Sequence, residues 1–472
     1  MRLAPSIASL VLASVACAQD PVVQFGSASP VGSNQPTRIS TIGTPRIGDS
    51  SFTLQLDCAQ PNSNAFLLLS SNHDSFTVQG LEFLIELGPD AVCLGPIPVD
   101  ADGVAEYALP IDPNDSLLGT QLVAQWVSQN ADSPSGLEAT RAVRVTVGQP
   151  EFRAVLATRV EVQLRDSSGV LDTASIAPLT EGLASSGSSL AVRADGRVAV
   201  VGLSRAMVSS ELRWIAVGDS ELTEVGTTEV EVNAVQIAFH PVTGNLFTYS
   251  GLAGLGPTPF TVREFDGDPD SPTFMSEIDS IAVLGGLGQR MDISPSGDRL
   301  IVSSGFSFQV IDTEPGSPTE GQVLLTRELG ALRAFAAVSP AGDTFFGLPP
   351  FSTDIEETDI ETGLLISSTP LSDGLSIAGS LCRTPAGEIA AVRIPSTELA
   401  FFEPFACGDA EVVTTLPAAN GFGSQSGVSF SLDGSTVFGV AGPDLVEIDR
   451  ASGVSSSTPT GLVDLVTGIA VR

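Results

Sequence analysis

Histidine, lysine and recognisable catalytic motifs are what this chain of 472 residues most clearly lacks. It contains only two histidines, His73 and His240, and all 21 of its basic residues are arginine. A Ser-His-Asp triad or a histidine metal cage would therefore have to draw its members from distant parts of the chain. Neither a G-x-S-x-G elbow nor a phosphate-binding P-loop is present. We interpret His240 as a structural residue of a turn and His73 as a residue of a polar loop.

Positive charge is also scarce, because 55 acidic residues stand against 21 basic ones and the net charge is −34 at pH 7. A chain this acidic repels nucleic acid and anionic membranes, so we expect neither as a partner. No apolar run after residue 18 approaches the roughly 18 residues that a membrane-spanning helix needs. We therefore expect no membrane span.

The first residues carry the pattern of a secretion signal. Arg2 is followed by an apolar run over residues 7–15 and by a small-x-small cleavage site over residues 16–18. We expect residues 1–18 to be removed and the protein to be exported to the periplasm, the cell surface or the medium. The alternative is a lipoprotein signal in which Cys17 is lipidated.

The exported chain would keep four cysteines, which divide two and two between its halves. An even number in an oxidising compartment predicts the disulfides Cys58–Cys93 and Cys382–Cys407. The chain has no C-x-x-C pair, so a zinc site is not expected.

One hairpin pattern recurs six times in the second part of the chain: a short apolar run, a turn that ends in glycine, and a second apolar run. The turn glycines are 45 to 53 residues apart, which is the period of a propeller blade. Glycine suits the turn because it adopts positive φ without strain. A second hairpin follows, most clearly at Thr353–Ser367 and Leu445–Ser457. Each copy thus predicts four antiparallel strands, which we name a to d. The copies of the first hairpin span residues 190–200, 237–247, 291–302, 336–346, 381–391 and 428–438.

The two ends of this repeat region complete one another. Residues 468–472 match strand a of the pattern, while residues 152–158, 160–165 and 170–176 supply strands b, c and d. Pairing them would make a composite blade that holds the ring shut. The sequence therefore predicts an all-β fold in which residues 151–472 form a seven-bladed β-propeller.

This region resembles the seven-bladed propellers of the YVTN, lactonase-like and WD-repeat superfamily. The resemblance lies in the turns SPSGDRL and SLDGSTV and in the hairpins IDRASG and DIETG. It covers about two thirds of the chain and implies a fold, not an activity. The Trp-Asp and Gly-His dipeptides of true WD repeats are missing.

The first part of the chain predicts a β-sandwich over residues 46–148, preceded by an extended lead-in over residues 19–45 that is rich in Gly, Ser and Pro. The stretches DADGVAEYALPID and LLGTQLVAQWV resemble an accessory domain of exported bacterial proteins. The predicted strands are Ser51–Asp57, Ala65–Ser70, Leu81–Leu87, Gly103–Leu109, Gln121–Val127 and Arg141–Val147.

A small polar ligand or a protein partner would bind such a ring where the d–a and b–c loops surround the mouth of its central channel. Arginines and carboxylates on these loops could bind a polar group, and lactonase-like propellers use this face. The alternative is that they are ordinary solvated charges. The candidates are Arg205, Arg290, Arg333, Asp354, Asp373 and Glu398.

The most acidic turn is a candidate calcium site. Asp266, Asp268 and Asp270 alternate in it, and Glu277 follows, an order of oxygen ligands that suits Ca²⁺. Ser271 stands where a calcium loop has glycine, and the alternative is an exposed hairpin turn without a metal. We expect no other cofactor.

Three functions fit these features. The first is a non-catalytic, monomeric, exported propeller that binds a ligand or protein at the channel mouth. The second is a lactonase-type hydrolase that uses the channel-mouth carboxylates, with or without a divalent metal. The third is a structural component of the cell envelope.

Overall fold

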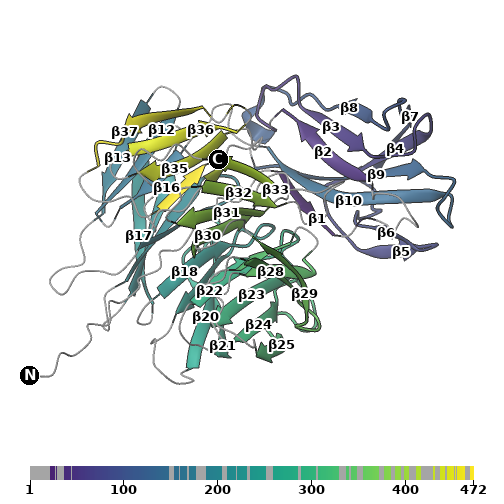
Figure 1. Ribbon diagram of the computed structural model, residues 1–472. Coiled ribbons are helices and arrows are strands. Elements are labelled where there is room, and N and C mark those ends of the chain that lie inside the picture. The colour runs from purple at the N-terminus through teal and green to yellow at the C-terminus, as the bar shows by residue number, and fades with distance from the viewer. Residues whose placement is uncertain are drawn as a thin grey trace, which may run out of the picture.

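The computed structural model consists almost entirely of antiparallel β-strands (Figure 1). The predicted signal sequence, residues 1–18, lies outside the described residues. Among the described residues, no helix has the length and apolar character needed to span a membrane. The structure describes residues 22–26, 28, 37–43, 45–117, 119–147, 154–158, 160–166, 169–176, 188–204, 210–218, 220–230, 234–250, 259–284, 289–304, 307–328, 336–339, 342–347, 354–370, 377–383, 389–394, 398–402, 411–415, 429–430, 436–441, 444–450, 452, 454–462 and 468–471.

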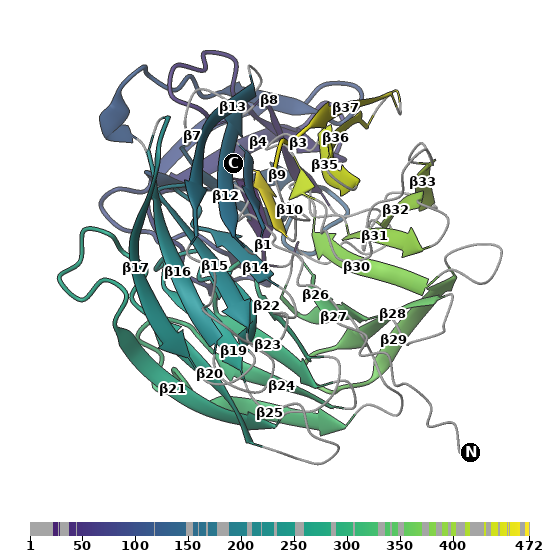
Figure 2. The same cartoon turned by 90° about the vertical axis from the view of Figure 1, so that its left-hand side faces the viewer.

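The second part of the chain is a β-propeller built from seven four-stranded sheets within the described residues. Figure 2 shows first strands such as β14, β22 and β30 toward the middle of the propeller and last strands such as β17, β21 and β29 at its periphery. Sheet 1 combines β38 (Gly468–Val471), β11 (Ala154–Ala157), β12 (Glu161–Asp166) and β13 (Gly169–Ser175).

Sheets 2 to 7 each consist of four strands that are consecutive in the chain. Sheet 2 is β14 (Ser188–Val192), β15 (Val198–Ser204), β16 (Ser210–Val217) and β17 (Leu222–Val230). Sheet 3 is β18 (Ala234–Phe239), β19 (Leu246–Ser250), β20 (Pro259–Phe265) and β21 (Glu277–Leu284). Sheet 4 is β22 (Gln289–Ile293), β23 (Arg299–Ser304), β24 (Ser307–Asp312) and β25 (Val323–Glu328). Sheet 5 is β26 (Ala336–Val338), β27 (Thr344–Gly347), β28 (Asp354–Asp359) and β29 (Leu365–Pro370). Sheet 6 is β30 (Ile377–Arg383), β31 (Ile389–Ile394), β32 (Glu398–Phe402) and β33 (Glu411–Thr415). Sheet 7 is β34 (Ser429–Phe430), β35 (Thr436–Ala441), β36 (Asp444–Asp449) and β37 (Ser455–Pro459).

The composite sheet predicted from the two ends of the repeat region is confirmed. β11 pairs with β38 in the register Ala154↔Val471 to Ala157↔Gly468 and with β12 on its other side. Phe438 and Leu445 of sheet 7 pack against Ala154 and Leu156 of sheet 1. Sheet 7, the last along the chain, thus meets sheet 1, the first, which leaves no open face between them.

Apolar residues on both faces of the sheets hold the propeller together. Even-numbered and odd-numbered positions of β15 belong to two separate buried clusters: Val201 packs toward sheet 1 and Val200 toward sheet 3. Trp214 of sheet 2 is fully buried and meets Phe265 of sheet 3 edge to face. This two-sided burial explains why the strands are nearly continuous apolar runs rather than alternating ones.

The first part of the chain forms two sheets that share one core. Leu54 and Leu56 of the smaller sheet pack with Leu67, Trp126 and Val143 of the larger one, and all five are buried. The larger sheet has the order β1 (Val22–Phe25), β10 (Leu137–Thr146), β9 (Gln121–Gln129), β4 (Asn64–Ser70) and β7 (Val92–Pro98). The smaller has the order β2 (Arg38–Ile42), β3 (Thr53–Asp57) and β8 (Ala105–Ala108). β5 (Phe76–Val78) pairs with β6 (Leu81–Phe83), and a short 3-10 helix, η1 (Asp115–Leu117), follows β8 in the chain.

The segment predicted as a lead-in, residues 19–45, contributes two strands to these sheets. β1 pairs with β10, and β2 pairs with β3. Its short apolar runs, too weak to indicate strands by themselves, become strands because they pair with long neighbours whose edges would otherwise stay open.

The predicted Cys58–Cys93 disulfide is not formed. Cys93 pairs with Leu68, near the end of β4, whereas Cys58 precedes the start of β4. The N–H of Asn62 donates to the carbonyl of Asp100, which follows the end of β7 that is farther from Cys93. A strand of this length spans about 20 Å, and a disulfide needs Cα atoms within about 7 Å. For the second pair, Cys407 lies outside the described residues, and only the backbone of Cys382 is described, in β30.

Candidate functional site: the junction between the N-terminal sheets and the propeller

The recurring glycine turns join strands a and b of each sheet and lie on one side of the propeller. Gly196, Gly244, Gly297 and Gly342 all have positive φ, between 69° and 84°, as the sequence predicts. The glycines of the last two copies, Gly387 and Gly434, lie outside the described residues.

Each of these turns packs against the next one around the propeller. A Cβ added at Gly244 would lie 2.5 Å from the guanidinium group of Arg193, and one added at Gly297 would lie 2.5 Å from the ring of His240. Arg193 and His240 occupy the same place in the repeat, directly after strand a, and each N–H donates to the carbonyl at the start of strand b. Glycine is therefore needed both for the turn and for the side chain beneath it.

His240 has a structural role, as the sequence interpretation proposes. Its Nδ1 accepts hydrogen bonds from the N–H groups of Val242 and Thr243, both 3.0 Å away. The proton is therefore on Nε2, which donates to the carbonyls of Gly297 at 2.8 Å and Thr313 at 3.1 Å. Burial lowers the pKa of His240 to about 4. Because both ring nitrogens are bonded to the backbone of the turns, this imidazole cannot act as a general base in the described arrangement.

The N-terminal sheets reach the propeller through the same turn of sheet 4. Arg144 of β10 donates to the carbonyl of Pro295 at 2.9 Å and to that of Ser296 at 3.3 Å. Its side chain is almost entirely buried, and its guanidinium lies 5.1 Å from the centre of the Phe25 ring. Three successive carbonyls, those of residues 295 to 297, are thus held by Arg144 from one part and by His240 from the other.

The polar loop of His73 also belongs to this junction, which corrects its interpretation as a solvated loop residue. The His73 ring meets Phe25 edge to face at 5.7 Å between centres. Burial and the charge of Arg144 lower the pKa of His73, against the opposing effect of Asp298. Both histidines of the chain therefore lie within range of the charge of the buried Arg144.

Further contacts extend the junction over four successive sheets. Gln121 at the start of β9 donates to the carbonyl of Pro241 in sheet 3 at 3.2 Å. A Cβ added at Gly119 would touch Asp195 of sheet 2 at 3.4 Å. Arg141 faces Asp343 of sheet 5, and burial lowers the pKa of Arg141 to about 10. All these propeller residues lie in a–b turns, so the N-terminal sheets cover the glycine-turn side.

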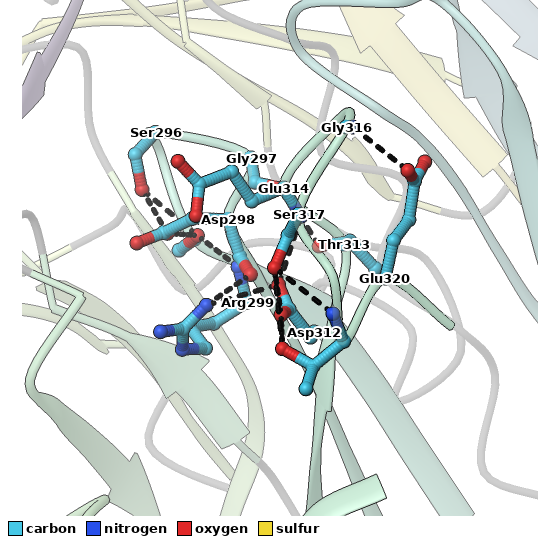
Figure 3. Close-up of polar contacts among 12 residues, drawn as sticks. Ser296, Gly297, Asp298, Arg299, Asp312, Thr313, Glu314, Gly316, Ser317 and Glu320 are labelled. Carbon is cyan, nitrogen blue, oxygen red and sulfur yellow. Dashed lines mark hydrogen bonds and ion pairs between the residues drawn. The ribbon is translucent and has the colours of Figure 1, made fainter. Parts of the chain in front are cut away.

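A network of polar side chains stabilises the sheet 4 turn to which Arg144 donates its hydrogen bonds (Figure 3). Asp298 accepts hydrogen bonds from the hydroxyls of Ser294 and Ser296. Thr313, directly after strand c, donates its hydroxyl to the carbonyl of Gly297 at 2.6 Å. Asp312 beside it accepts from Ser317 at 2.7 Å and from Arg299 at 3.2 Å. The turn is thus held by its own side chains as well as by Arg144.

The four residues proposed as a calcium site are not brought together as ligands. Asp268 pairs with Arg193 at 3.3 Å, Asp270 with Arg197 at 2.7 Å, and Glu277 with Arg263 at 3.1 Å. The fourth, Asp266, is nearly buried and accepts from Thr273 at 2.7 Å.

Two of these arginines come from sheet 2, and the third lies on the neighbouring strand of sheet 3. Within the described part of the chain, no three His, Cys, Asp or Glu side chains are placed to hold a metal ion. The acidic turn therefore links sheets 2 and 3, and its carboxylates are neutralised by arginine in place of a cation.

The channel-mouth candidates are placed only in part. Arg290 lies at the start of strand a in sheet 4, paired with Ser303, and only its backbone is described. Asp354 and Glu398 are the first residues of strands c in sheets 5 and 6, again with only their backbones described. These strand ends are opposite the glycine turns, as the alternation of antiparallel strands requires. The other three candidates, Arg205, Arg333 and Asp373, lie outside the described residues.

Arg144 is the functional residue that the sequence interpretation misses. It lies in the predicted strand Arg141–Val147, where Val143 and Val145 face the shared core. An arginine in the alternate position indicates a solvent-facing side of the strand. In the structure Ala142, Arg144 and Thr146 are buried as well. Ala142 packs with Phe25, Leu84 and Ile85, and Arg144 contacts the sheet 4 turn of the propeller.

Comparison with known proteins agrees with the fold and adds no activity. No known family matches the sequence, and no curated protein matches it. Many solved structures are similar. A functionally unknown protein from Desulfotomaculum acetoxidans is 13% identical, with 68% of this chain and 98% of that chain covered and a TM-score of 0.49.

A periplasmic gluconolactonase from Pseudomonas aeruginosa is 14% identical, with 68% and 98% covered and a TM-score of 0.47. A Myceliophteria thermophila β-propeller domain, Swd1, is 10% identical, with 66% and 93% covered and a TM-score of 0.43.

Proposed function

We propose that this protein is an exported, non-catalytic scaffold in which the seven sheets form one seven-bladed ring. The N-terminal sheets close its glycine-turn side, and the opposite side binds a small polar ligand or a protein partner. The observation that supports this most is the one-sided junction, where residues 119 to 144 contact the a–b turns of sheets 2, 3 and 4 and the charge of Asp343 in sheet 5 acts on Arg141.

In this proposal the two sides of the ring have separate roles, attachment on one and ligand binding on the other. A buried arginine that donates to two backbone carbonyls fixes the orientation of the N-terminal sheets far better than a set of exposed ion pairs could. The ends of the strands that carry Arg290, Asp354 and Glu398 are the ones that these contacts leave uncovered. Arginine and carboxylate at the mouth of a ring suit a ligand that carries both hydroxyl and charged groups.

The roles of the two histidines favour a scaffold over a hydrolase. His240 is bonded through both nitrogens to backbone groups, and His73 packs on Phe25 at the junction. Neither is available to move protons at the channel mouth. Export, the monomeric state and the absence of nucleic-acid partners remain part of this proposal, and the net charge of −34 supports the last.

A paired activity and binding screen tests the proposal. The purified protein would be incubated with lactones and esters, with and without added divalent cations, and its thermal midpoint would be measured against sugar acids and other small polar compounds. We expect no turnover and at least one stabilising compound, whose effect is lost in Arg290→Ala and kept in the junction variant Gln121→Ala. Turnover that Asp354→Asn abolishes would overturn the proposal in favour of a lactonase-type hydrolase.

A further inference from the structure

The last strand of each sheet has one edge that pairs with no further strand among the described residues. Charged side chains on such edges normally prevent another strand from adding to the sheet. β13, β17, β21, β25 and β33 all carry at least one acidic residue. Only β29 and β37 lack charge altogether, with the sequences LISSTP and SSSTP.

Of these two strands, β29 alone begins with exposed aliphatic residues. Leu364, Leu365 and Ile366 are 68%, 53% and 54% exposed. The two strands end in the same Ser-Ser-Thr-Pro. By register Ser455 of β37 is the counterpart of Leu365, and Ile366 is an additional residue at a β-bulge of β29. The chain thus contains a matched pair of uncharged edges, one apolar and one polar.

The surroundings of β29 are acidic. The preceding segment 354–361 contains five carboxylates, Asp354, Glu356, Glu357, Asp359 and Glu361, and no base. One arginine of the neighbouring sheet, Arg327, packs its side-chain carbons against Gly363. The apolar edge is therefore bordered by an excess of negative charge.

We propose that β29 is a docking edge at which an extended basic segment of a partner protein adds as a fifth strand of sheet 5. Backbone hydrogen bonds would form along residues 365 to 369, because Pro370 has no N–H and ends the strand. Aliphatic residues of the partner would cover Leu365 and Ile366, while its lysines or arginines would face Glu357 and Glu361.

Charge selects this occupant over a second copy of the chain. A two-fold pairing of β29 with itself would bring the same five carboxylates together twice, in molecules that each carry a net charge of −34. Like charges across such an interface oppose association, whereas a basic strand is attracted by the same field and associates faster. This lateral surface is separate from the proposed channel-mouth site, and its test does not depend on that site.

A synthetic peptide serves as the probe: a labelled twelve-residue strand of alternating valine and lysine, measured by fluorescence anisotropy at low and high salt. We expect binding to the wild-type protein that weakens with salt. The double substitution Leu365→Ser and Ile366→Ser, which gives β29 the character of β37, should weaken it about tenfold or more, equivalent to about 1.4 kcal/mol. Val454→Ser, the same change beside β37, should leave it unaltered. Because all these positions are exposed, equal thermal midpoints would show that the variants fold.

Hydrogen exchange locates the site independently, since the amides of residues 365 to 369 that face away from β28 should be protected by the peptide. Three results would overturn the proposal. The first is equal binding by the double variant, and the second is equal binding of a peptide with glutamate in place of lysine. The third is a dimer of the protein alone that the double substitution dissociates, which would make the occupant of β29 a second copy.

Discussion

Acidification should weaken the fold through His240. The ring is buried between turns of sheets 3 and 4, and both nitrogens are used, one as an acceptor and one as a donor. A second proton would go on Nδ1, where it would displace the hydrogen bonds from Val242 and Thr243. Arg144 of β10 faces the ring with its positive charge, which opposes protonation, while the carboxylate of Asp298 favours it.

The size of the effect follows from the two pKa values. Burial lowers the pKa of His240 in the folded protein from 6.5 to about 4, so the unfolded chain takes up the proton first as the pH falls. The stabilising contribution is complete above pH 6.5 and is lost as the pH falls from there to about 4. At about 1.4 kcal/mol per pKa unit, the total is about 3 kcal/mol, of which about 2 kcal/mol is lost by about pH 5.

Urea denaturation near pH 7.5 and near pH 5 measures this loss. His240→Gln is neutral at both values, so the wild-type protein should lose about 2 kcal/mol more between them than the variant does. The comparison removes the contribution of the many carboxylates, which is common to both proteins. His73→Gln is the control, because the His73 ring is only half-buried and should account for a smaller part of the pH-dependent loss in the free energy of unfolding. The same pH dependence in wild type and His240→Gln would refute the assignment of the proton to Nε2 in a buried, neutral ring.

Three further predictions concern the junction, the composite sheet and the cysteines. Arg144→Ala should leave the carbonyls of Pro295 and Ser296 without donors. We expect it to lower the free energy of unfolding by about 2–5 kcal/mol or to enlarge the radius of gyration in small-angle scattering. The control Arg197→Ala should lower the free energy of unfolding by less than about 1 kcal/mol, because the ion pair of Arg197 is exposed. An unaltered stability and radius in Arg144→Ala would contradict the account of the junction. Deleting residues 468–472 should uncover the fully buried Val155 and Leu156 of β11 and cost about 3–6 kcal/mol, and an unchanged thermal midpoint would argue against the composite sheet. Cys93 should react with a thiol reagent in the unreduced native protein and lose that signal in Cys93→Ser, and an unreactive Cys93 would mean that it is bridged after all.

The parts of the fold that could be predicted are those that the repeat encodes locally. A glycine flanked by two apolar runs specifies a hairpin because the turn needs positive φ, and Gly297 in sheet 4 is one example. Repetition then predicts the sheets, and the leftover strands at the two ends predict their own pairing. The register Ala154↔Val471 joins residues more than 300 positions apart, yet the sequence indicates it because every other sheet already shows where strand a belongs.

The failed predictions involve partners that no local pattern reveals. Asp268 and Asp270 resemble metal ligands in their own turn, but they are paired with Arg193 and Arg197 of the preceding sheet. No sequence feature near residue 266 indicates that those arginines are the partners of this turn. In the same way, Cys58 and Cys93 form a plausible pair by number and compartment, and the extended β4 keeps them at opposite ends.

The junction shows why a repeat hides its functional differences. Arg193, His240 and Ser294 follow strand a in three successive sheets, and each lies beneath the glycine of the next turn. These three residues occupy equivalent positions in the repeat, but their turns leave different atoms accessible on the side that the N-terminal sheets contact. Ser294 and Ser296 direct their hydroxyls to Asp298, so the carbonyls of Pro295 and Ser296 remain free for Arg144. The specificity of docking therefore depends on which backbone carbonyls a turn leaves exposed. The side chains of the turn determine this together, and an alignment of the repeats on the turn glycine does not show it.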